Sequence, residues 1–416
     1  MAREMKDSGV AWIGEIPSDW KLSKIGSLYS QRIEKVSDKD YPPLSVTMKG
    51  ILPQLATAAK SDDGDNRKLV RIGDFAINSR SDRRGSCGVS LYDGSVSPIN
   101  IILTPRNTMN SGYYDWLFHT SLFADEFYKW GHGIVDDLWT TRWQEMKSII
   151  VPVPNLHEQE RIAHFLNQRC AEIDTVLDKT RTSIEEYKKL KQAIITQAVT
   201  KGIRGDRPMK ESGVIWLDTV PAEWTISKIK YTIFPKEKPV LPMDEVITCF
   251  RDGTVTLRRN RREEGFTISF TENGYQGVDV GDLVIHGMDT FAGAIGCSDS
   301  RGKTSPVVHV CSTVGNNRYF MYFLRYMAYS GVLMDFSNGV RIRSSDFRNF
   351  KKLAVFEMLV PPLREQNKIV DYLDSTLAKI DQVIKQKEIL ISELEACKKS
   401  AIYEYVTGKR EVPNAY

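Results

Sequence analysis

Long apolar runs and cysteine pairs are both missing from this sequence. No apolar stretch approaches the length of a membrane span, so we expect no transmembrane helix. The first seven residues carry several charges and no apolar signal-peptide core follows them, which predicts a cytoplasmic location. None of the six cysteines forms a Cys-x-x-Cys pair, and their spacing gives no disulfide framework. We therefore expect reduced, mostly buried thiols and no metal site.

Motifs of common nucleotide-dependent and methylating enzymes are also missing. An adenine methyltransferase is expected to carry an Asn/Asp-Pro-Pro-aromatic motif, whereas Pro42-Pro43 follows Tyr41 and Pro361-Pro362 opens a helical segment. In the segment Gly296–Thr304 the glycines are one residue too far apart for a phosphate-binding loop. The carboxylate pairs lack the Glu-x-Lys companion of a typical nuclease site. The sequence therefore predicts no catalytic centre and no cofactor in this chain.

The strongest positive feature is an internal repeat of about half the chain. Residues 5–25 and 209–229 are related by a constant shift of 204, with 11 of 21 positions identical. Both segments contain the same Pro-x-x-Trp sequence, at Pro17 and Pro221. A repeat of this length predicts two complete domains of one fold, since solenoid repeats are only about 20–50 residues long.

Two further pairs of segments repeat along the chain. Pro154–Ile162 matches Pro361–Ile369, and Gly73-Asp74 matches Gly281-Asp282. We call these, with the two Pro-x-x-Trp segments, the anchor segments. Most of the sequence between them differs between the copies. This pattern predicts a shared scaffold that carries two different variable regions, with domain boundaries at residues 1–150, 151–208, 209–358 and 359–416.

Each copy ends in one long predicted helix. Residues Glu158 to about Thr200, and Glu365 to about Val406, contain neither proline nor glycine, and apolar residues recur at steps of three and four. Such a narrow apolar stripe on a helix of about 60 Å needs a partner. We expect the two helices to pair as an antiparallel intramolecular coiled coil. The alternative is two surface helices, each packed on its own domain.

The variable regions are predicted to be mixed α/β domains. Short β-like runs, such as Asp74–Asn78 and Asp282–Ile285, lie between Gly, Asp and Ser turns. Residues 113–130 and 318–333 have aromatic, helical patterns, and we interpret their aromatic side chains as core. The expected fold is therefore two tandem α/β domains joined by two long helices, with pseudo-twofold symmetry.

Basic residues gather in the predicted turns of both variable regions. The net charge of only +4 does not by itself indicate nucleic acid, so these local clusters carry the hypothesis. Arginine suits paired contacts with guanine edges and phosphates, and lysine adds charge for phosphates. The predicted DNA-binding residues are Arg67, Lys68, Arg80, Arg83, Arg84, Arg251, Arg258, Arg259, Arg261, Arg262, Arg301, Lys303, Arg341 and Arg343.

The anchor segments resemble those of the specificity (S) subunit of type I restriction–modification systems. The resemblance covers essentially the whole chain and is most specific where the Pro-x-Leu-x-Glu-Gln or Pro-Leu-x-Glu-Gln sequence opens each helix, at Glu158-Gln159 and Glu365-Gln366. It implies that each variable region is a target recognition domain for one half of a bipartite, asymmetric DNA site. It also implies that residues 1–25 complete the end of the second helix, as residues 205–229 complete the first.

The resemblance further implies a non-catalytic subunit of a larger complex. The paired helices would fix the gap between the half-sites and would dock two methylating subunits that bind S-adenosylmethionine. Motor-nuclease subunits using ATP and Mg²⁺ would complete the restriction enzyme. Two alternatives remain open: a two-lobed coiled-coil scaffold that binds proteins, and a solitary methyltransferase or nuclease with an unrecognised motif.

Overall fold

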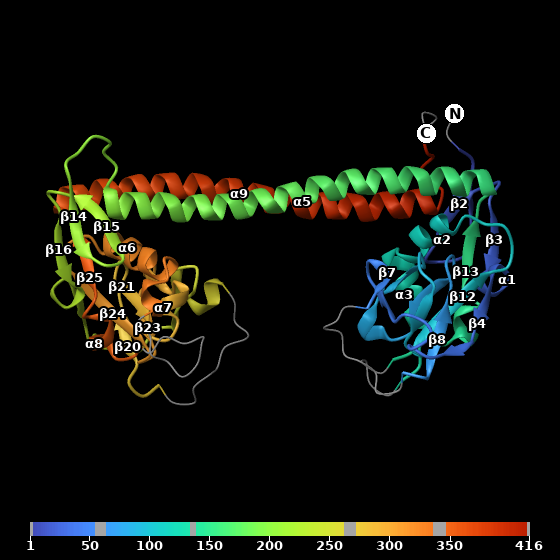
Figure 1. Cartoon of the computed structure of the whole chain (residues 1–416), viewed down its shortest axis with the longest axis horizontal. Coiled ribbons are helices and arrows are strands. Elements are labelled where there is room, and N and C mark those ends of the chain that lie inside the picture. Colours follow the sequence, from blue (N-terminus) through green and yellow to red (C-terminus); the bar gives the residue numbers. More distant parts are fainter. Residues whose placement is uncertain (1–2, 55–63, 134–138, 262–271, 336–346, 414–416) are drawn as a thin grey trace. The chain divides into compact units, whose positions relative to one another are not determined.

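The computed structural model describes residues 3–54, 64–133, 139–261, 272–335 and 347–413. The chain divides into two compact units (Figure 1). Unit 1 comprises Met1–Thr180 and Ile389–Tyr416, and unit 2 comprises Arg181–Glu388. Each unit contains one mixed α/β domain and a portion of both long helices. The fold class expected from the sequence is confirmed.

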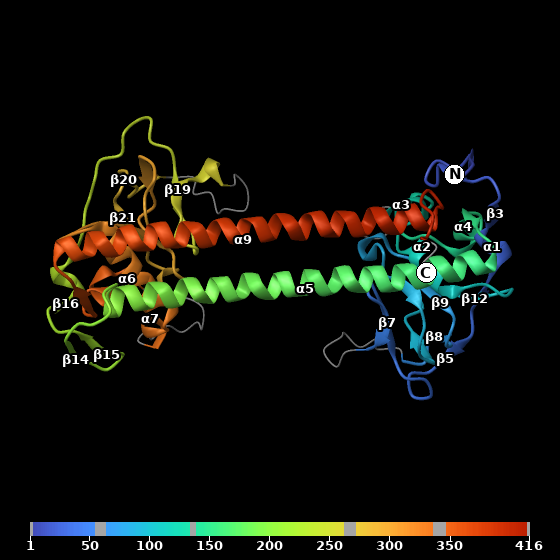
Figure 2. The ribbon, with the colours of Figure 1, turned by 90° about the horizontal axis from the view of Figure 1, so that it is seen from above.

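The two long helices are α5 (Leu156–Lys201) and α9 (Leu363–Val406). Within unit 1, the Lys398 ammonium of α9 lies 2.6 Å from an Asp174 carboxylate oxygen of α5. Within unit 2, Lys191 of α5 forms an ion pair with Asp381 of α9. Within each unit the two helices lie side by side and run in opposite directions in both views (Figures 1 and 2). The antiparallel pairing is confirmed, and the alternative of two separate surface helices is wrong.

The helices form where the sequence predicts them and for the expected reasons. The Asn155 side chain accepts a hydrogen bond of 2.9 Å from the Glu158 backbone N–H, which satisfies one of the unpaired donors of the first turn of α5. Gly202 and Gly408, with φ of 77° and 71°, follow the last turns of α5 and α9. Glycine adopts this left-handed conformation without steric cost, so it ends a helix readily. The apolar stripe of α5 is largely buried, whereas that of α9 is buried towards its ends and half-buried between Ile384 and Ala401.

The α/β domains repeat one sheet topology. The largest sheet has the order β10-β9-β12-β4 in unit 1 and β22-β21-β24-β17 in unit 2, and every neighbouring pair is antiparallel. Their bounds are β4 Tyr29–Arg32, β9 Phe75–Asn78, β10 Cys87–Val89, β12 Asn100–Pro105, β17 Ile233–Pro235, β21 Leu283–His286, β22 Ile295–Cys297 and β24 Val308–Thr313.

Smaller sheets and short helices surround the two four-stranded sheets, and most of them also occur in pairs. In unit 1 they are β1 Met5–Asp7, β2 Glu15–Pro17, β3 Lys21–Lys24, α1 Ile25–Leu28, β5 Lys35–Val36, β6 Leu44–Thr47, β7 Gly50–Pro53, β8 Arg67–Val70, β11 Gly94–Val96, α4 Trp143–Met146 and β13 Ile150–Val153. In unit 2 they are β14 Met209–Val214, β15 Leu217–Pro221, β16 Thr225–Lys228, β18 Ile247–Cys249, β19 Val255–Leu257, β20 Gln276–Val278, β23 Gly302–Thr304, α8 Phe350–Leu353 and β25 Glu357–Val360.

Aromatic helices cover the core of each domain. The helical region predicted at residues 113–130 is two helices, α2 (Ser111–Phe118) and α3 (Ser121–Lys129), because the Thr120 hydroxyl accepts from the Phe123 N–H and caps a new helix. In unit 2 the corresponding helices are α6 (Asn317–Tyr329) and α7 (Val332–Asp335). Their large rings are almost all buried, so the interpretation of these aromatics as core is confirmed. No helix in the described part of the chain is long and apolar enough to span a membrane.

The Pro-x-x-Trp and Glu-Gln anchor segments meet at one junction in each unit. In unit 2 the Glu365 carboxylate at the start of α9 accepts from the Arg207 guanidinium at 2.5 Å and from the Trp224 indole N–H at 2.9 Å. The Arg207 guanidinium lies over the Trp224 ring, 5.2 Å from its centroid. Opposite charge and an indole donor thus surround a carboxylate that is largely removed from water. The Pro-x-x-Trp and Glu-Gln sequences recur together because they form one contact.

Unit 1 repeats this junction with equivalent residues. The Glu158 carboxylate accepts from the Arg3 guanidinium and, at 2.8 Å, from the Trp20 indole. The same repetition extends to the domain helices, since Gln159 accepts from the Asn110 backbone N–H and Gln366 accepts from that of Asn316, both at 2.9 Å. Arg3 and Arg207 were missed in the sequence, although extending the first repeat upstream at its constant shift aligns them.

The ends of the chain pack in unit 1 as a continuous segment packs in unit 2. The Tyr113 hydroxyl donates to the carbonyl of Val406 at the end of α9. The Tyr319 hydroxyl occupies the corresponding place beside the carbonyl of Val199, near the end of α5. Gly408 lies against the Trp20 ring, as Gly202 lies against that of Trp224. Residues near the N-terminus therefore complete the end of α9, as the resemblance implied.

Candidate nucleic-acid interface

The predicted basic residues of unit 2 gather on the turns around β18, β19 and β23. Arg258 and Arg259 lie in a 3₁₀ turn, Arg258–Asn260, that directly follows β19, and Arg261 comes next. The Arg259 and Arg261 side chains are exposed, whereas Arg258 is half-buried. Arg251 is exposed in the turn between β18 and β19. The hairpin thus brings four of the predicted arginines together on one small region of the domain.

Carboxylates accompany three of these arginines. The shortest N···O distances are 3.0 Å for Arg251–Asp289, 2.7 Å for Arg259–Glu245 and 2.7 Å for Arg261–Asp252. Exposed ion pairs of this kind contribute little to stability because water screens them. The arginine side chains themselves remain accessible to DNA phosphates or base edges.

Arg301 and Lys303 lie in a more enclosed charged network. The Arg301 guanidinium donates to Asp244 at 2.8 Å and to Asp279 at 2.5 Å, and Lys303 lies 2.6 Å from Glu272. These contacts place Arg301 as a brace between the β20–β23 sheet and the segment before β18. Gly302–Thr304 is strand β23, so the glycine-containing segment there adopts an extended strand and not a phosphate-binding turn.

The network around Arg301 is expected to weaken in acid. Hydrogen bonds from Arg301 lower the pKa of Asp244, and hydrogen bonds from Lys238 and Arg301 lower that of Asp279, from an ordinary value of 3.8. A carboxyl group with a lowered pKa contributes stability above its unfolded pKa and loses it as the pH falls through the folded one. Between pH 5 and about pH 3 we therefore expect the wild-type chain to lose more free energy of unfolding than Asp244→Asn does. Urea unfolding of both proteins at the two pH values measures this difference, and equal losses would contradict it.

In unit 1, Arg67 and Lys68 are turned toward the protein. Arg67 is buried on β8 and its guanidinium donates to the hydroxyl and the carbonyl of Ser95, both at 2.8 Å. The Lys68 ammonium donates to the Asn100 carbonyl at 2.7 Å. Burial lowers the pKa of both groups. These contacts join neighbouring strands and are those of residues with a structural role.

Arg80, Arg83 and Arg84 lie on the exposed turn after β9. Arg83 is 3.6 Å from the neighbouring Asp82, and Arg84 forms an ion pair with Asp125. The Arg84 guanidinium also lies 5.5 Å from the centroid of the Tyr128 ring. Helix α3 anchors the start of this turn, because the Tyr128 hydroxyl donates to the carbonyl of Asn78 at 2.9 Å. A rigid turn with exposed arginines is suited to contact a polyanion.

The remaining predicted residues, Arg262, Arg341 and Arg343, lie outside the described residues. The structure adds two residues that the sequence did not indicate: Phe250 and Asp252, both within contact distance of Arg261. Neither belongs to a motif, and only the β18–β19 pairing brings them to Arg261. In the described part of the chain no three His, Cys, Asp or Glu residues are placed to hold a metal ion.

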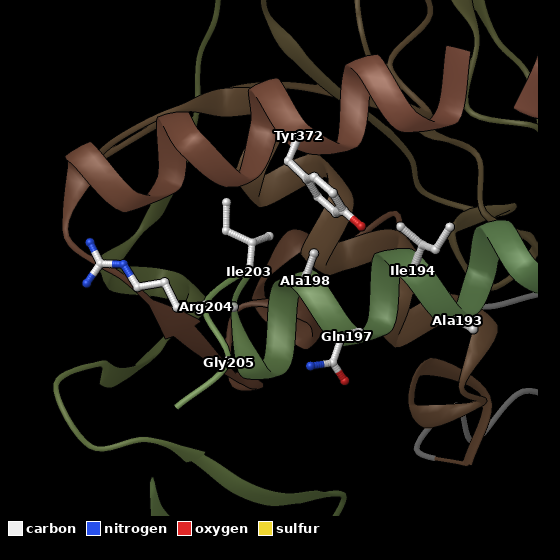
Figure 3. Close-up of a pocket in the computed structure, with 9 residues that line it drawn as sticks. Ala193, Ile194, Gln197, Ala198, Ile203, Arg204, Gly205 and Tyr372 are labelled. Carbon is white, nitrogen blue, oxygen red and sulfur yellow. The ribbon is translucent and has the colours of Figure 1, made fainter. Parts of the chain in front are cut away.

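The helix pair of unit 2 carries a groove, and the equivalent place in the helix pair of unit 1 is filled by that unit's own side chains. The groove has a volume of about 580 Å³ and lies between α5 and α9. Figure 3 shows the Tyr372 ring of α9 directed toward Ile194 and Ala198 of α5. At the equivalent place in unit 1 the Tyr405 ring packs on Phe165 with centroids 4.6 Å apart. The small Ala198 in place of a tyrosine explains why the groove of unit 2 is open.

Comparisons with known proteins cover nearly the whole chain. It is 21% identical to the putative type I restriction enzyme MjaX specificity subunit of Methanocaldococcus jannaschii, over 96% of each chain. It is 23% identical to the type I restriction enzyme MjaVIII specificity subunit of the same organism, over 96% of this chain and 95% of the relative. No model of a protein family matches the chain.

Solved structures share the fold. A chain from a structure of complex assembly and conformational transition in the type I restriction–modification system aligns with a TM-score of 0.69 at 14% identity, covering 95% of this chain and 99% of that one. The HsdS subunit from Thermoanaerobacter tengcongensis aligns with a TM-score of 0.51 at 14% identity, covering 95% and 98%. Together these comparisons confirm the resemblance to type I specificity subunits.

Proposed function

We propose that this chain, which has the fold of type I specificity subunits and resembles them over nearly its whole length, recognises a bipartite DNA sequence. Each α/β domain recognises one half of the target. The observation that carries the proposal is the contrast between the copies: the buried junctions repeat atom for atom, while the basic turns differ in sequence and in position. Two domains that share one scaffold and differ in their surface turns are suited to recognise two different half-sites.

The exposed arginines form the proposed DNA surface. In unit 2 they are those of the β18–β19 region, and in unit 1 those of the turn after β9. Arg67 and Lys68 are engaged with Ser95 and Asn100 inside the unit 1 domain, and Arg301 is engaged with Asp244 and Asp279. This assignment separates side chains that can reach a groove or a phosphate from those already committed to backbone carbonyls and carboxylates.

The helix pair is proposed to set the half-site spacing and to dock the methylating subunits. Its exposed faces, including the groove beside Tyr372, offer apolar and small side chains to a partner. The chain itself contributes no catalytic group in this proposal. Methyl transfer from S-adenosylmethionine takes place in the methylating subunits, and ATP- and Mg²⁺-dependent cleavage takes place in the motor-nuclease subunits.

The double variant Arg258→Ala, Arg259→Ala is expected to weaken DNA binding by the assembled complex. Loss of two positive charges near the phosphates releases about two fewer counterions, so the slope of log affinity against log salt should become shallower by about 2. Binding to a duplex that contains the target site is measured at several salt concentrations. Unchanged affinity and slope would remove this turn from the DNA surface.

The second candidate is a coiled-coil scaffold whose two lobes bind proteins, favoured by the apolar groove between the helices. A steep fall of DNA affinity with salt separates the first proposal from the scaffold. S-adenosylmethionine binding by the isolated chain, measured by calorimetry, would instead favour a solitary methyltransferase. The proposed function requires that such binding be absent or weak.

A further inference from the structure

The turn between β18 and β19 is fixed by its own hydrogen bonds. The Phe250 backbone N–H donates to the Thr254 carbonyl, and the Gly253 N–H donates to the Phe250 carbonyl, both at 2.9 Å. The Asp252 carboxylate accepts from the Thr254 N–H at 3.0 Å. Gly253 has a φ of 87°, and a Cβ there would lie 3.0 Å from the Ile295 carbonyl of β22, so the turn packs closely on the sheet. Asp252 and Phe250 are therefore presented from a rigid support.

Arg261 lies against both of these residues. Its guanidinium donates from Nη1 to Asp252 Oδ1 at 3.0 Å, and its Nη2 lies 2.7 Å from Oδ2. Its Cζ lies 4.3 Å from the centroid of the Phe250 ring. Burial acts to raise the pKa of Asp252, but hydrogen bonds from Arg261 and Thr254 outweigh it, and the pKa is lowered. The guanidinium plane is thus fixed from one edge by a carboxylate and from one face by an aromatic ring.

This geometry leaves one edge of the guanidinium for a ligand. An arginine has five N–H donors, and Asp252 engages its end-on pair, Nη1 and Nη2. Within the described part of the chain, no hydrogen bond engages the side-on pair, which is formed by Nε–H and the second hydrogen of one Nη. Two parallel donors match the O6 and N7 acceptors of guanine in the major groove. Because the Arg261 side chain is already held in the free protein, binding costs it little further conformational entropy. A donor pair held in one orientation also favours guanine over other bases.

We infer that Arg261 recognises a guanine in the half-site of unit 2, and that Asp252 and Phe250 position its guanidinium for that contact. The inference rests on the proposed function. Asp252 and Phe250 act here as positioning residues, and only Arg261 contacts the base. The competing explanation is an exposed ion pair that stabilises the hairpin and has no part in recognition.

The sign of a charge effect separates these explanations. Asp252→Asn removes a negative charge close to a polyanion, so general electrostatics predicts tighter DNA binding. If Asp252 positions Arg261, the same variant weakens binding to the target duplex instead. Glu245→Gln is the matched control, because it removes the same charge from the Arg259 ion pair in the neighbouring turn. We expect this control to bind the target duplex as tightly as the wild type or more tightly.

Mapping of adenine methylation in cells that carry the chain with its methylating partner tests the base itself. Asp252→Asn and Arg261→Lys are both expected to relax the same single guanine position in one half-site. Methylation of sites with another base there should rise about tenfold to a hundredfold relative to the target, the discrimination given by one paired contact. Arg261→Lys keeps the positive charge, so its agreement with Asp252→Asn excludes a purely coulombic effect.

Several results would overturn the inference. They are an unchanged motif in both variants, relaxation at a position without guanine, and tighter binding of Asp252→Asn to the target duplex. Failure of the proposed function would look different, because the wild-type complex would then give no sequence-specific methylation at all. Circular dichroism and co-purification with the methylating subunit establish that each variant is folded and assembled.

Discussion

Replacing Glu365 with alanine is expected to lower the free energy of unfolding of unit 2 by about 3–5 kcal/mol, the usual cost of removing one partner of a buried ion pair. The Glu365 and Arg207 side chains are only 6% and 7% exposed, and the Trp224 side chain is fully buried. The variant leaves the buried indole N–H without its acceptor and leaves the buried guanidinium with only its ion pair to the exposed Glu223. The groups that lose a partner, more than the lost attraction itself, make the effect large.

The duplication supplies the control for this variant. Glu158→Ala breaks the equivalent junction in unit 1, where the Arg3 and Glu158 side chains are 22% and 17% exposed. Water can replace more of the lost contacts there, so we expect a smaller loss of stability. Hydrogen exchange of the full chain, resolved by peptide, assigns each loss to its unit. Equal effects of the two variants would contradict the role of burial.

Removal of one heptad from each long helix is expected to change the spacing between the half-sites and leave their sequences unchanged. Seven residues of α-helix are about 10 Å long, and about 3 base pairs of B-form DNA cover the same distance. The ion pair Lys191–Asp381 defines an antiparallel register within unit 2, in which residues 184–190 face residues 382–388. Deletion of both segments together preserves the pairing of the rest.

Methylation mapping measures the outcome of this deletion. We expect both half-sites of the wild-type motif, separated by a gap about 3 base pairs shorter. Deletion of residues 184–190 alone is the control, because it shifts α5 against α9 and should disrupt assembly with the methylating subunits. A motif with altered half-site sequences and an unchanged gap would contradict the role of the helices in spacing.

The scaffold was predictable because its determinants are local. The apolar stripes of α5 and α9 lie within the helices, and the capping residue and the terminating glycines lie next to them in the sequence. The repeat identified the equivalent parts of the two units. The split of residues 113–130 into two helices depended on a single hydroxyl, that of Thr120, whose capping role the aromatic pattern around it hid.

The candidate interface was less predictable because it depends on contacts between distant residues. In the sequence analysis Arg67 stands in one group with Arg80, Arg83 and Arg84. In the structure Arg67 is buried, and its guanidinium donates to Ser95 on the neighbouring strand β11. Asp252 and Arg261 are separated by nine positions, and their pairing depends on the β18–β19 hairpin. A cluster of basic residues in a sequence therefore indicates a surface, but only the strand pairing tells which of its members remain available to a ligand.

In unit 1 the segment around Trp20 packs against the end of α9, and this packing has a topological consequence. Residues around Trp20 and Val406 make the contacts that an unbroken stretch of chain makes around Val199 and Trp224. The same contacts therefore occur at two places. At the end of α5 the chain continues directly into the segment around Trp224, whereas at the end of α9 the chain is not continuous with the segment around Trp20. The two junctions use equivalent contacts, so a gene rearranged to begin near residue 207 would encode the same set of contacts with the order of the two α/β domains reversed.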